Sequence, residues 1–391
     1  MTLPEILYYI GYSLDKRYKL KHQKRLPHKV ISIGNITVGG TGKTPATIAI
    51  AEEAKKRGFS PVVLTRGYRG KAKGPCFVKA VTSNEYKGSN KLQATSNEYN
   101  YKNNSSLNKL VTYNSSLVTA FKDSSLVTRH SSLFFGDEPV LMVKRLKDVP
   151  IVKCFDRYKG GVFALSSLHR SNTPFLFILD DGFQHWKLHR DIDIVLIDGL
   201  NPFGNGKMLP MGPLREPLNE LKRADIFVVT KTPLQSPLDK GGIRGVLSDK
   251  LKGINPEAPV YFSEYRIHKV RDMDDNEYPI EILKDKKVYA FCGIANPDSF
   301  RQTVLSISGD LVGFKRYRDH CRYSQKDVTY LARQAREFGS DFLLTTEKDM
   351  VKIKEIQNSK FKIQIDNALC LEIDFSIEPE FFDEVFKNIP P

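Results

Sequence analysis

The chain lacks the sequence features of secreted, zinc-binding or membrane-spanning proteins. Its 391 residues include 5 cysteines, far apart and without a C-x-x-C pair, which argues against a zinc ribbon or disulfide framework and favours a reducing compartment. No apolar run approaches the roughly 18 residues of a membrane-spanning helix. The N-terminus also lacks the order of a signal peptide, because its basic residues follow the apolar segment instead of preceding it.

Negative charge is scarce as well. The chain carries 45 Asp and Glu against 60 Lys and Arg, a formal net charge of +15, so we expect an anionic partner. Nucleic acid, an acidic membrane surface and a phosphorylated substrate all meet that requirement. No helix-turn-helix, zinc or basic-zipper pattern supports nucleic acid, and we therefore predict that the chain binds none.

Residues 1–28 predict an N-terminal amphipathic helix with a basic flank. Apolar side chains share one face of residues 3–14, with tyrosines around it and basic residues following from position 16. Such a helix suits the headgroup layer of an anionic membrane. The alternative is a helix packed on the domain and followed by a solvated linker. The apolar residues are Leu3, Ile6, Leu7, Ile10 and Leu14, and the tyrosines are Tyr8, Tyr9 and Tyr12.

Short apolar runs alternate with helical stretches and predict an α/β fold with a mostly parallel sheet flanked by helices. We predict a first α/β domain, of the phosphate-loop NTPase type, over 29–258 and a smaller C-terminal α/β domain over 259–391. The expected strands of the first are 29–33, 61–65, 150–155, 175–179, 193–198 and 225–230. Those of the second are 259–265, 287–293, 311–317, 341–346 and 371–377.

Two segments interrupt this alternation. Residues 82–133 are rich in Ser and Asn and repeat themselves, with "TSNEY" at 82–86 and again at 95–99. Low hydrophobicity and imperfect repeats predict an insertion outside the packed core. The stretch "PLQSPLDKGGIRG" at 233–245 predicts a smaller loop insertion, and we assign neither segment a catalytic role.

The stretch "VISIGNITVGGTGKTP" at 30–45 predicts a phosphate-binding loop, although Thr37 stands where the pattern G-x-x-x-x-G-K-[ST] has its first glycine. An expected strand precedes the loop and an expected helix follows it, as phosphate binding requires. We expect Lys43 to reach the terminal phosphates of a nucleotide and Thr44 to bind Mg²⁺. The alternative is a glycine turn with a solvated lysine. The predicted nucleotide-binding residues are Thr37, Gly39, Gly40, Thr41, Gly42, Lys43 and Thr44.

A pair of carboxylates follows the apolar run 175–179. Asp180 and Asp181 lie at the carboxyl end of this expected strand, where ligands bind in open α/β sheets. A carboxylate there commonly supports the Mg²⁺ of a phosphate-loop enzyme, and the alternative is a helix cap or surface turn. His185 and His189 have the spacing of a zinc pair, but Gly182 and an expected loop count against zinc.

Other polar residues allow a structural and a catalytic interpretation. Asp137 and Glu138 precede an amphipathic pattern, and from the residues alone we interpret Asp137 as the cap of that helix. The alternative is that Asp137 is a general base and that Glu138 lies near the metal. The Asp319–His320 pair is a weaker candidate for a catalytic role, and the alternative is a structural histidine. Arg66 and Arg215 follow expected strands, where guanidinium groups can hold phosphates.

Taken together, these motifs resemble the tetraacyldisaccharide 4'-kinase family, the lipid A 4'-kinases of Gram-negative bacteria. The resemblance runs from about residue 30 to 352, and it makes Thr37 part of that family's own loop. The matching stretches, in the family's order, are "GNITVGGTGKTP", "LTRGYRG", "GDEPVLM", "DRYKG", "LDDGFQH", "LPMGPLREP", "FCGIANP", "RDHCRYS" and "TTEKDMVK". One departure is the 82–133 segment, a gap that the family crosses more briefly.

The resemblance implies transfer of the γ-phosphate of ATP, with Mg²⁺, to the 4'-hydroxyl of tetraacyldisaccharide 1-phosphate, a lipid A precursor. It also implies a peripheral protein on the cytoplasmic face of the inner membrane, docked on anionic lipid through its N-terminal helix. By the same analogy Asp137 is the base and His320 orients it. The implied metal ligands are Thr44, Glu138, Asp180 and Asp181, and the implied substrate-binding residues are Arg66, Asn205 and Arg215.

Two other functions fit parts of the sequence. A GTPase or an ATP-dependent ligase would share the phosphate loop, but the guanine-reading N-K-x-D element is absent, since Pro233 stands two residues after Lys231. A membrane-surface scaffold that binds nucleotide without turnover is the second alternative. The joint presence of four residues argues against the scaffold: Lys43, Thr44, Asp137 and Asp181.

Overall fold

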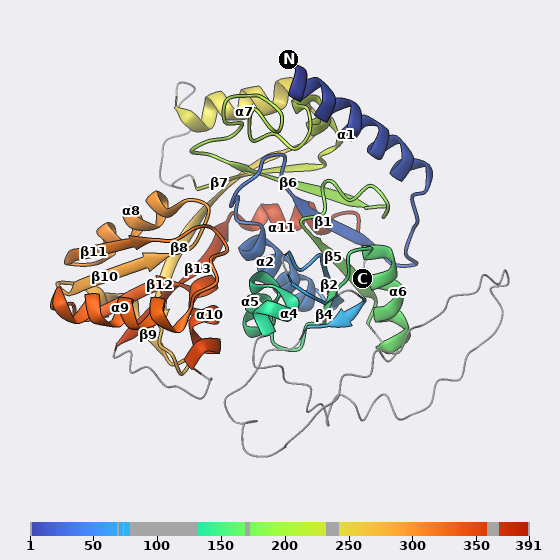
Figure 1. Cartoon of the computed structure of the whole chain (residues 1–391). Coiled ribbons are helices and arrows are strands. Elements are labelled where there is room, and N and C mark those ends of the chain that lie inside the picture. Colours follow the sequence, from blue (N-terminus) through green and yellow to red (C-terminus); the bar gives the residue numbers. More distant parts are fainter. Residues whose placement is uncertain are drawn as a thin grey trace.

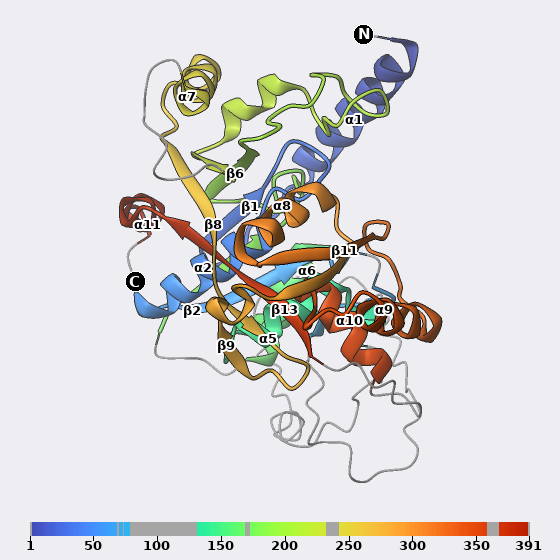
Figure 2. The same cartoon turned by 90° about the vertical axis from the view of Figure 1, so that its left-hand side faces the viewer.

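The computed structural model describes residues 2–68, 70–72, 74–78, 131–168, 173–231, 242–357 and 367–389. These residues form two lobes that lie side by side and share one continuous mixed sheet (Figure 1; Figure 2). The α/β fold predicted from the sequence is confirmed.

The first lobe is an α/β layer structure around a sheet with the strand order β7-β6-β1-β5-β2-β4-β3, which is parallel except for the edge strand β3. Its central strands are fully buried because they are covered on both faces, as their unbroken apolar runs predicted. The strands are β1 (Val30–Gly34), β2 (Ser60–Thr65), β3 (Cys76–Phe77), β4 (Ile151–Lys153), β5 (Phe175–Asp180), β6 (Ile192–Asp198) and β7 (Ile226–Thr230). The helical elements are α2 (Lys43–Lys56), α4 (Ser131–Phe135), α5 (Asp137–Arg145), α6 (Arg157–Ser167), η2 (Leu218–Arg223) and α7 (Ile243–Ile254).

The second lobe continues the sheet in the order β8-β13-β12-β10-β11, with β9 paired to β8. Its strands are β8 (Val260–Arg271), β9 (Glu277–Pro279), β10 (Lys287–Cys292), β11 (Asp310–Arg316), β12 (Phe342–Thr346) and β13 (Ala368–Ile377). Its helical elements are η3 (Ile280–Leu283), α8 (Pro297–Ile307), α9 (Gln325–Glu337) and α10 (Glu347–Gln357), and the last helix is α11 (Pro379–Phe386).

Strand β8 joins the two lobes. Its first residues pair in parallel with β7, as Val260 does with Phe227, and its remainder pairs antiparallel with β13. After β13 the chain returns to the first lobe. Helix α11 packs there, and Phe381 is fully buried in the same core as Ile31. The boundary predicted between 258 and 259 thus falls just before a strand that both lobes share.

Both predicted loop insertions end earlier than expected. Helix α7 begins at Ile243 and α4 begins at Ser131, so the loop assignments of 243–245 and 131–133 are wrong. The start of α4 depends on a distant partner, since the Ser132 N–H donates to Glu355 Oε1 at 2.6 Å, and no local pattern encodes that contact. The rest of the two segments, 82–130 and 233–241, lies outside the described residues.

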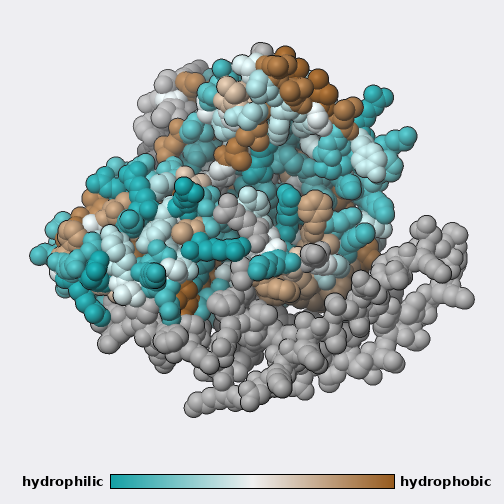
Figure 3. Space-filling model, viewed as in Figure 1, coloured by the Kyte–Doolittle hydropathy of each residue, from teal (hydrophilic) through white to brown (hydrophobic). Residues whose placement is uncertain are grey.

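Helix α1 (Leu3–Lys21) packs on the first lobe through its tyrosines and not through its apolar face. The Tyr8 hydroxyl donates to the Arg215 carbonyl at 2.8 Å, and Tyr12 packs edge-on against Trp186. The helix therefore packs on the domain, as the alternative interpretation expected, but its apolar residues do not form the contact. Leu7 and Leu14 are 62% and 65% exposed, and Figure 3 shows hydrophobic side chains gathered over α1 at the upper end of the molecule.

The helix is also longer than the predicted 3–14, so several basic residues of the expected flank lie on the helix itself. Lys16 pairs with Glu220 and Lys19 with Asp15, while Arg17 and Lys21 are exposed. Within the described ranges, every helix is too short or too polar to cross a bilayer.

Candidate functional site

A cavity of about 1310 Å³ lies where the two lobes meet. The loop after β1 and the residues that follow β2 and β5 form its first wall. Helix α1 lines one end, and α8 and the start of α10 line the side of the second lobe. The carboxyl ends of neighbouring parallel strands are the expected place for a ligand in such a sheet.

The phosphate loop joins β1 to α2 and opens on this cavity. Gly42 is the N-cap of α2 with φ 83°, and a Cβ there would lie 1.7 Å from the Tyr265 hydroxyl, so only glycine fits. Lys43 Nζ lies 3.2 Å from Asn35 Oδ1 and 3.6 Å from Asp181 Oδ1. The residues from Gly39 to Thr44 all line the cavity. Thr37 is buried outside the lining and bridges to Leu214, so its part in nucleotide binding stays a prediction.

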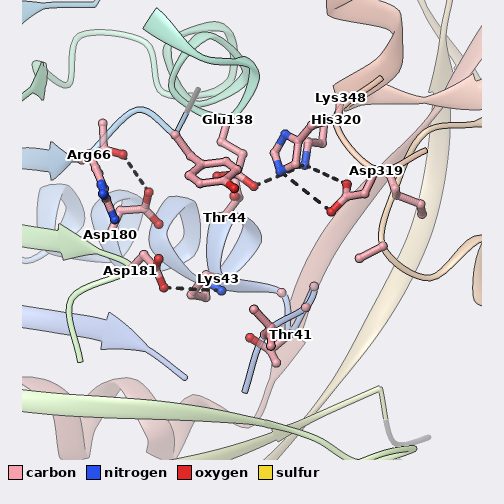
Figure 4. Close-up of a pocket in the computed structure, with 18 of the residues that line it drawn as sticks. Thr41, Lys43, Thr44, Arg66, Glu138, Asp180, Asp181, Asp319, His320 and Lys348 are labelled. Atoms are coloured by element: carbon pink, nitrogen blue, oxygen red, sulfur yellow. Dashed lines mark hydrogen bonds and ion pairs between the residues drawn. The ribbon is translucent and has the colours of Figure 1, made fainter. Parts of the chain in front are cut away.

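Asp180 is the last residue of β5 and Asp181 follows it, and both face the phosphate loop, as Figure 4 shows. Asp180 is buried, and its Oδ2 accepts a hydrogen bond from the Thr65 hydroxyl at 2.9 Å. Burial and then the charges of Glu138 and Asp181 raise the pKa of Asp180 to about 7. Burial also acts to raise the pKa of Asp181, but the charges of Lys43 and Arg215 outweigh it and lower that pKa to about 2.

This wall fits a magnesium ion. Asp180 is a carboxylate whose pKa is raised first by burial and then by the charges of Glu138 and Asp181, and a bound cation would offset both effects. The described residues contain no group of three or more His, Cys, Asp or Glu placed to hold a metal. Magnesium needs none, because it is held by one or two carboxylates together with phosphate oxygens and waters. Thr44, Glu138, Asp180 and Asp181 all line the cavity.

Asp137 meets His320 from the second lobe. Asp137 Oδ2 lies 3.1 Å from His320 Nδ1, although 183 residues separate the two. The cap interpretation of Asp137 is wrong, because the N-cap of α5 is Gly136 and the Asp137 side chain turns to the other lobe. Burial acts to raise the pKa of Asp137, but the hydrogen bond with His320 and the charges of Lys348 and Lys352 outweigh it, so the pKa lies well below its ordinary value.

The Asp137–His320 pair reaches the cavity through His320. Asp137 is 7% exposed and does not itself line the cavity, whereas His320 and Glu138 do. His320 adopts a left-handed backbone conformation with φ 55°, and its ring packs against Tyr68 at 5.3 Å between centroids. Such a conformation costs energy for a non-glycine residue and is concentrated at functional sites.

The predicted substrate-binding residues divide into two groups. Arg66 and Arg215 line the cavity, with Arg66 over the Phe155 ring and Arg215 Nη1 3.0 Å from Asp181 Oδ1. Asn205 lies outside the lining and stabilises its own loop, since its amide donates to the Met211 carbonyl at 2.9 Å. A substrate role for Asn205 stays a prediction.

Two residues that line the cavity, Arg157 and Lys348, were not predicted from the sequence. Arg157 follows β4 and is 4% exposed, and its Nε finds no hydrogen-bond partner among the described residues. Its position after a strand in "DRYKG" was the available signal. Burial lowers the pKa of Arg157 to about 10, although the charges of Asp181 and Asp180 act in the opposite direction. Lys348, the second residue of α10, is the other, and its motif "TTEKD" gave no indication of what it contacts.

Comparisons with known proteins agree with this geometry. The family model described as Tetraacyldisaccharide-1-P 4'-kinase matches residues 5–96 and 117–389. A Tetraacyldisaccharide 4'-kinase of Syntrophus aciditrophicus is 31% identical over 96% of this chain and 88% of the relative. One of Halothermothrix orenii is 34% identical over 90% of this chain and 80% of the relative.

A solved structure is similar as well. LpxK from Aquifex aeolicus, in complex with ATP, has a TM-score of 0.65 and 27% identity to this chain, and the similarity covers 98% of this chain and 96% of that one. The stretch that the family model leaves unmatched, 97–116, falls inside the repetitive segment. Because the match extends over nearly everything else, the chain belongs to the tetraacyldisaccharide-1-P 4'-kinase family.

Proposed function

We propose that this chain is a lipid kinase that transfers the γ-phosphate of ATP to the 4'-hydroxyl of tetraacyldisaccharide 1-phosphate, a step of lipid A biosynthesis. One observation carries the proposal: His320 of the second lobe, which is paired with Asp137 of the first, meets the phosphate loop at one cavity. Family membership sets the GTPase and ligase alternatives aside.

The first lobe binds the nucleotide. Backbone N–H groups at the start of α2, together with the positive end of its dipole, receive the phosphates, and Lys43 neutralises their charge. Thr44, Glu138, Asp180 and Asp181 would hold Mg²⁺. That ion supplies charge neutralisation on the phosphate oxygens when it is bound.

The transfer step needs a nucleophile, a leaving group and a proton acceptor. The 4'-oxygen bonds to the γ-phosphorus while the bond from that phosphorus to the β,γ-bridging oxygen breaks, and ADP leaves. The hydroxyl proton passes to the Asp137–His320 pair, in which the buried Asp137 supplies the negative charge and His320 links it to the cavity. Arg66 and Arg215 lie on the same wall and stabilise phosphate charge.

The acceptor's acyl chains remain in a bilayer, so the cavity must come to the membrane surface. Helix α1 presents its apolar side chains to solvent, and Leu7 and Gly11 also line the cavity. The helix therefore joins the apolar surface directly to the site. This arrangement supports a peripheral enzyme docked on anionic lipid at the cytoplasmic face of the inner membrane.

The test is transfer of labelled phosphate from ATP to tetraacyldisaccharide 1-phosphate in detergent micelles with Mg²⁺. We expect label in the lipid only when ATP, Mg²⁺ and a free 4'-hydroxyl are all present. A folded protein that binds ATP but labels no lipid would overturn the kinase and favour the nucleotide-binding scaffold.

Charging the exposed face of α1 should weaken membrane binding. In Leu7→Glu together with Leu14→Glu, we expect affinity for anionic phospholipid vesicles to fall at least about tenfold, because burying each leucine contributes roughly 1.5–3 kcal/mol. Sedimentation with vesicles measures it. Leu305→Glu on α8, a leucine that is 44% exposed in the second lobe, is the matched control and should bind as wild type does. Equal binding by all three proteins would exclude α1 as the docking element.

A further inference from the structure

Lys348 occupies the centre of a polar cluster built from both lobes (Figure 4). Its Nζ lies 3.2 Å from His320 Nε2 and 3.4 Å from Glu138 Oε1. Asp319 Oδ1 and Asp137 Oδ2 follow at 3.8 and 4.0 Å. The side chain is 17% exposed and lines the cavity, so it is placed among the groups of the site and not among solvated lysines.

The contact with His320 restricts where the imidazole proton lies. An ammonium group has donors and no acceptor, so its hydrogen bond to Nε2 requires the lone pair of that nitrogen. The proton of the neutral ring then lies on Nδ1, which donates to Asp137 Oδ2 at 3.1 Å. A proton on Nε2 would face the lysine charge at 3.2 Å, while the carboxylate that could receive it, Asp319 Oδ2, is more distant at 3.9 Å.

Lys352, a second lysine on the same helix, has the contacts expected of a structural residue. Lys352, one turn further along α10, lies 3.6 Å from Asp137 Oδ2. It is also bound to its own lobe, through Asp349 Oδ1 at 2.9 Å and the Cys321 carbonyl at 3.3 Å. Lys348, in contrast, contacts His320, Glu138 and Asp319, which all belong to the site, and Glu138 comes from the opposite lobe.

We propose that Lys348 is a positioning residue for phosphoryl transfer: it donates to His320 Nε2 and thereby keeps that nitrogen free of a proton, with Nδ1–H directed at Asp137. This inference rests on the proposed function for its effect on rate. Its effect on the histidine ring stands on the geometry alone. When the acceptor hydroxyl arrives, it takes the donor position at Nε2, and Glu138 and Asp319 keep the lysine charge within the cluster.

The test combines kinetics with nitrogen NMR of the full chain labelled with ¹⁵N-histidine, the His320 signals being assigned with His320→Gln. In wild type we expect a proton on Nδ1 and none on Nε2. Lys348→Met should place a proton on Nε2, directed at Asp319. It should lower kcat about 10–10²-fold with the KM for ATP nearly unchanged, as for a displaced catalytic group. Lys348→Arg keeps the charge and a donor, so it should retain the wild-type nitrogen signature and a higher kcat than Lys348→Met.

Lys354→Met is the matched control, because Lys354 lies on α10 outside the cluster and pairs with Asp275. It should leave both readouts unchanged. A wild-type Nε2 that carries a proton, or Lys348→Met with wild-type kcat, would overturn the proposal. A raised KM for ATP at unchanged kcat would also overturn it and assign Lys348 to phosphate binding. If wild type itself transfers no phosphate, the proposed function fails, while the nitrogen signals still decide the placement of Lys348.

Discussion

Replacing Asp137 by asparagine should lower kcat for phosphoryl transfer by about 10²–10⁴-fold, the range for a lost acid–base group. The amide has nearly the shape of the carboxylate but neither its charge nor its basicity. The change removes the carboxylate that receives the His320 Nδ1–H. It also takes one of several counter-charges from Lys348 and Lys352, which keep Glu138 and Asp349 as partners. ATP affinity should change little, because Asp137 faces the second lobe and not the phosphate loop.

This prediction separates chemistry from folding and binding. Labelled-phosphate transfer gives kcat, calorimetry gives ATP affinity, and the unfolding midpoint reports on the fold. Asp383→Asn is the matched control, because Asp383 is an exposed acid on α11 whose partner is Arg57, and it should be as active as wild type. If Asp137→Asn keeps a kcat within a few-fold of wild type, the Asp137–His320 pair is not the proton acceptor.

Replacing Lys43 by methionine should lower kcat about 10²–10³-fold, as the loss of one preorganised donor at a developing charge does. Lys43 is 15% exposed, and its contacts are Asn35 and Asp181 in the same wall of the cavity. Its charge is therefore held at the loop before any nucleotide binds. We also expect weaker ATP binding, because the lysine contacts the phosphates before and during transfer.

A lysine on the same helix provides the comparison. Lys56 is 74% exposed at the C-terminal end of α2 and pairs with Glu53, so Lys56→Met should behave as wild type. The ratio kcat/KM for ATP measures both variants. Equal values for Lys43→Met and Lys56→Met would mean that the loop does not hold the transferred phosphate.

Local sequence predicted the first lobe and the loop well. Strands such as β1 and β5 are continuous apolar runs because both faces of the sheet are covered, and glycines such as Gly42 mark positions where the backbone needs φ > 0°. Asp180 and Asp181 followed from their position at the end of a buried strand. Each of these signals lies within a few residues of the feature that it predicts.

Contacts between the lobes were beyond local reasoning. The capping rule favoured a structural Asp137, and the partner that overrides it, His320, is 183 residues away. Only the resemblance to a known family brought the two together. The resemblance included "TTEKDMVK" but assigned Lys348 no role, because this stretch does not show that α10 approaches Glu138 of the other lobe.

The orientation of helix α1 could be predicted only in part. Periodicity placed its apolar residues on one side of a helix but could not say whether that side packs inward. The hydrogen bonds of Tyr8 and Tyr12 to Arg215 and Glu216 fix the tyrosine side on the body, which leaves the leucines exposed.

The most direct test of the account is the position of the phosphate in the product. Tetraacyldisaccharide 1-phosphate should be incubated with the full chain, ATP and Mg²⁺, and the lipid product analysed by phosphorus–proton correlation NMR. The account predicts a new phosphorus signal coupled to the proton at carbon 4', with the 1-phosphate signal retained. A new phosphate at any other hydroxyl, a diphosphate at position 1, or ATP hydrolysis without lipid modification would contradict it.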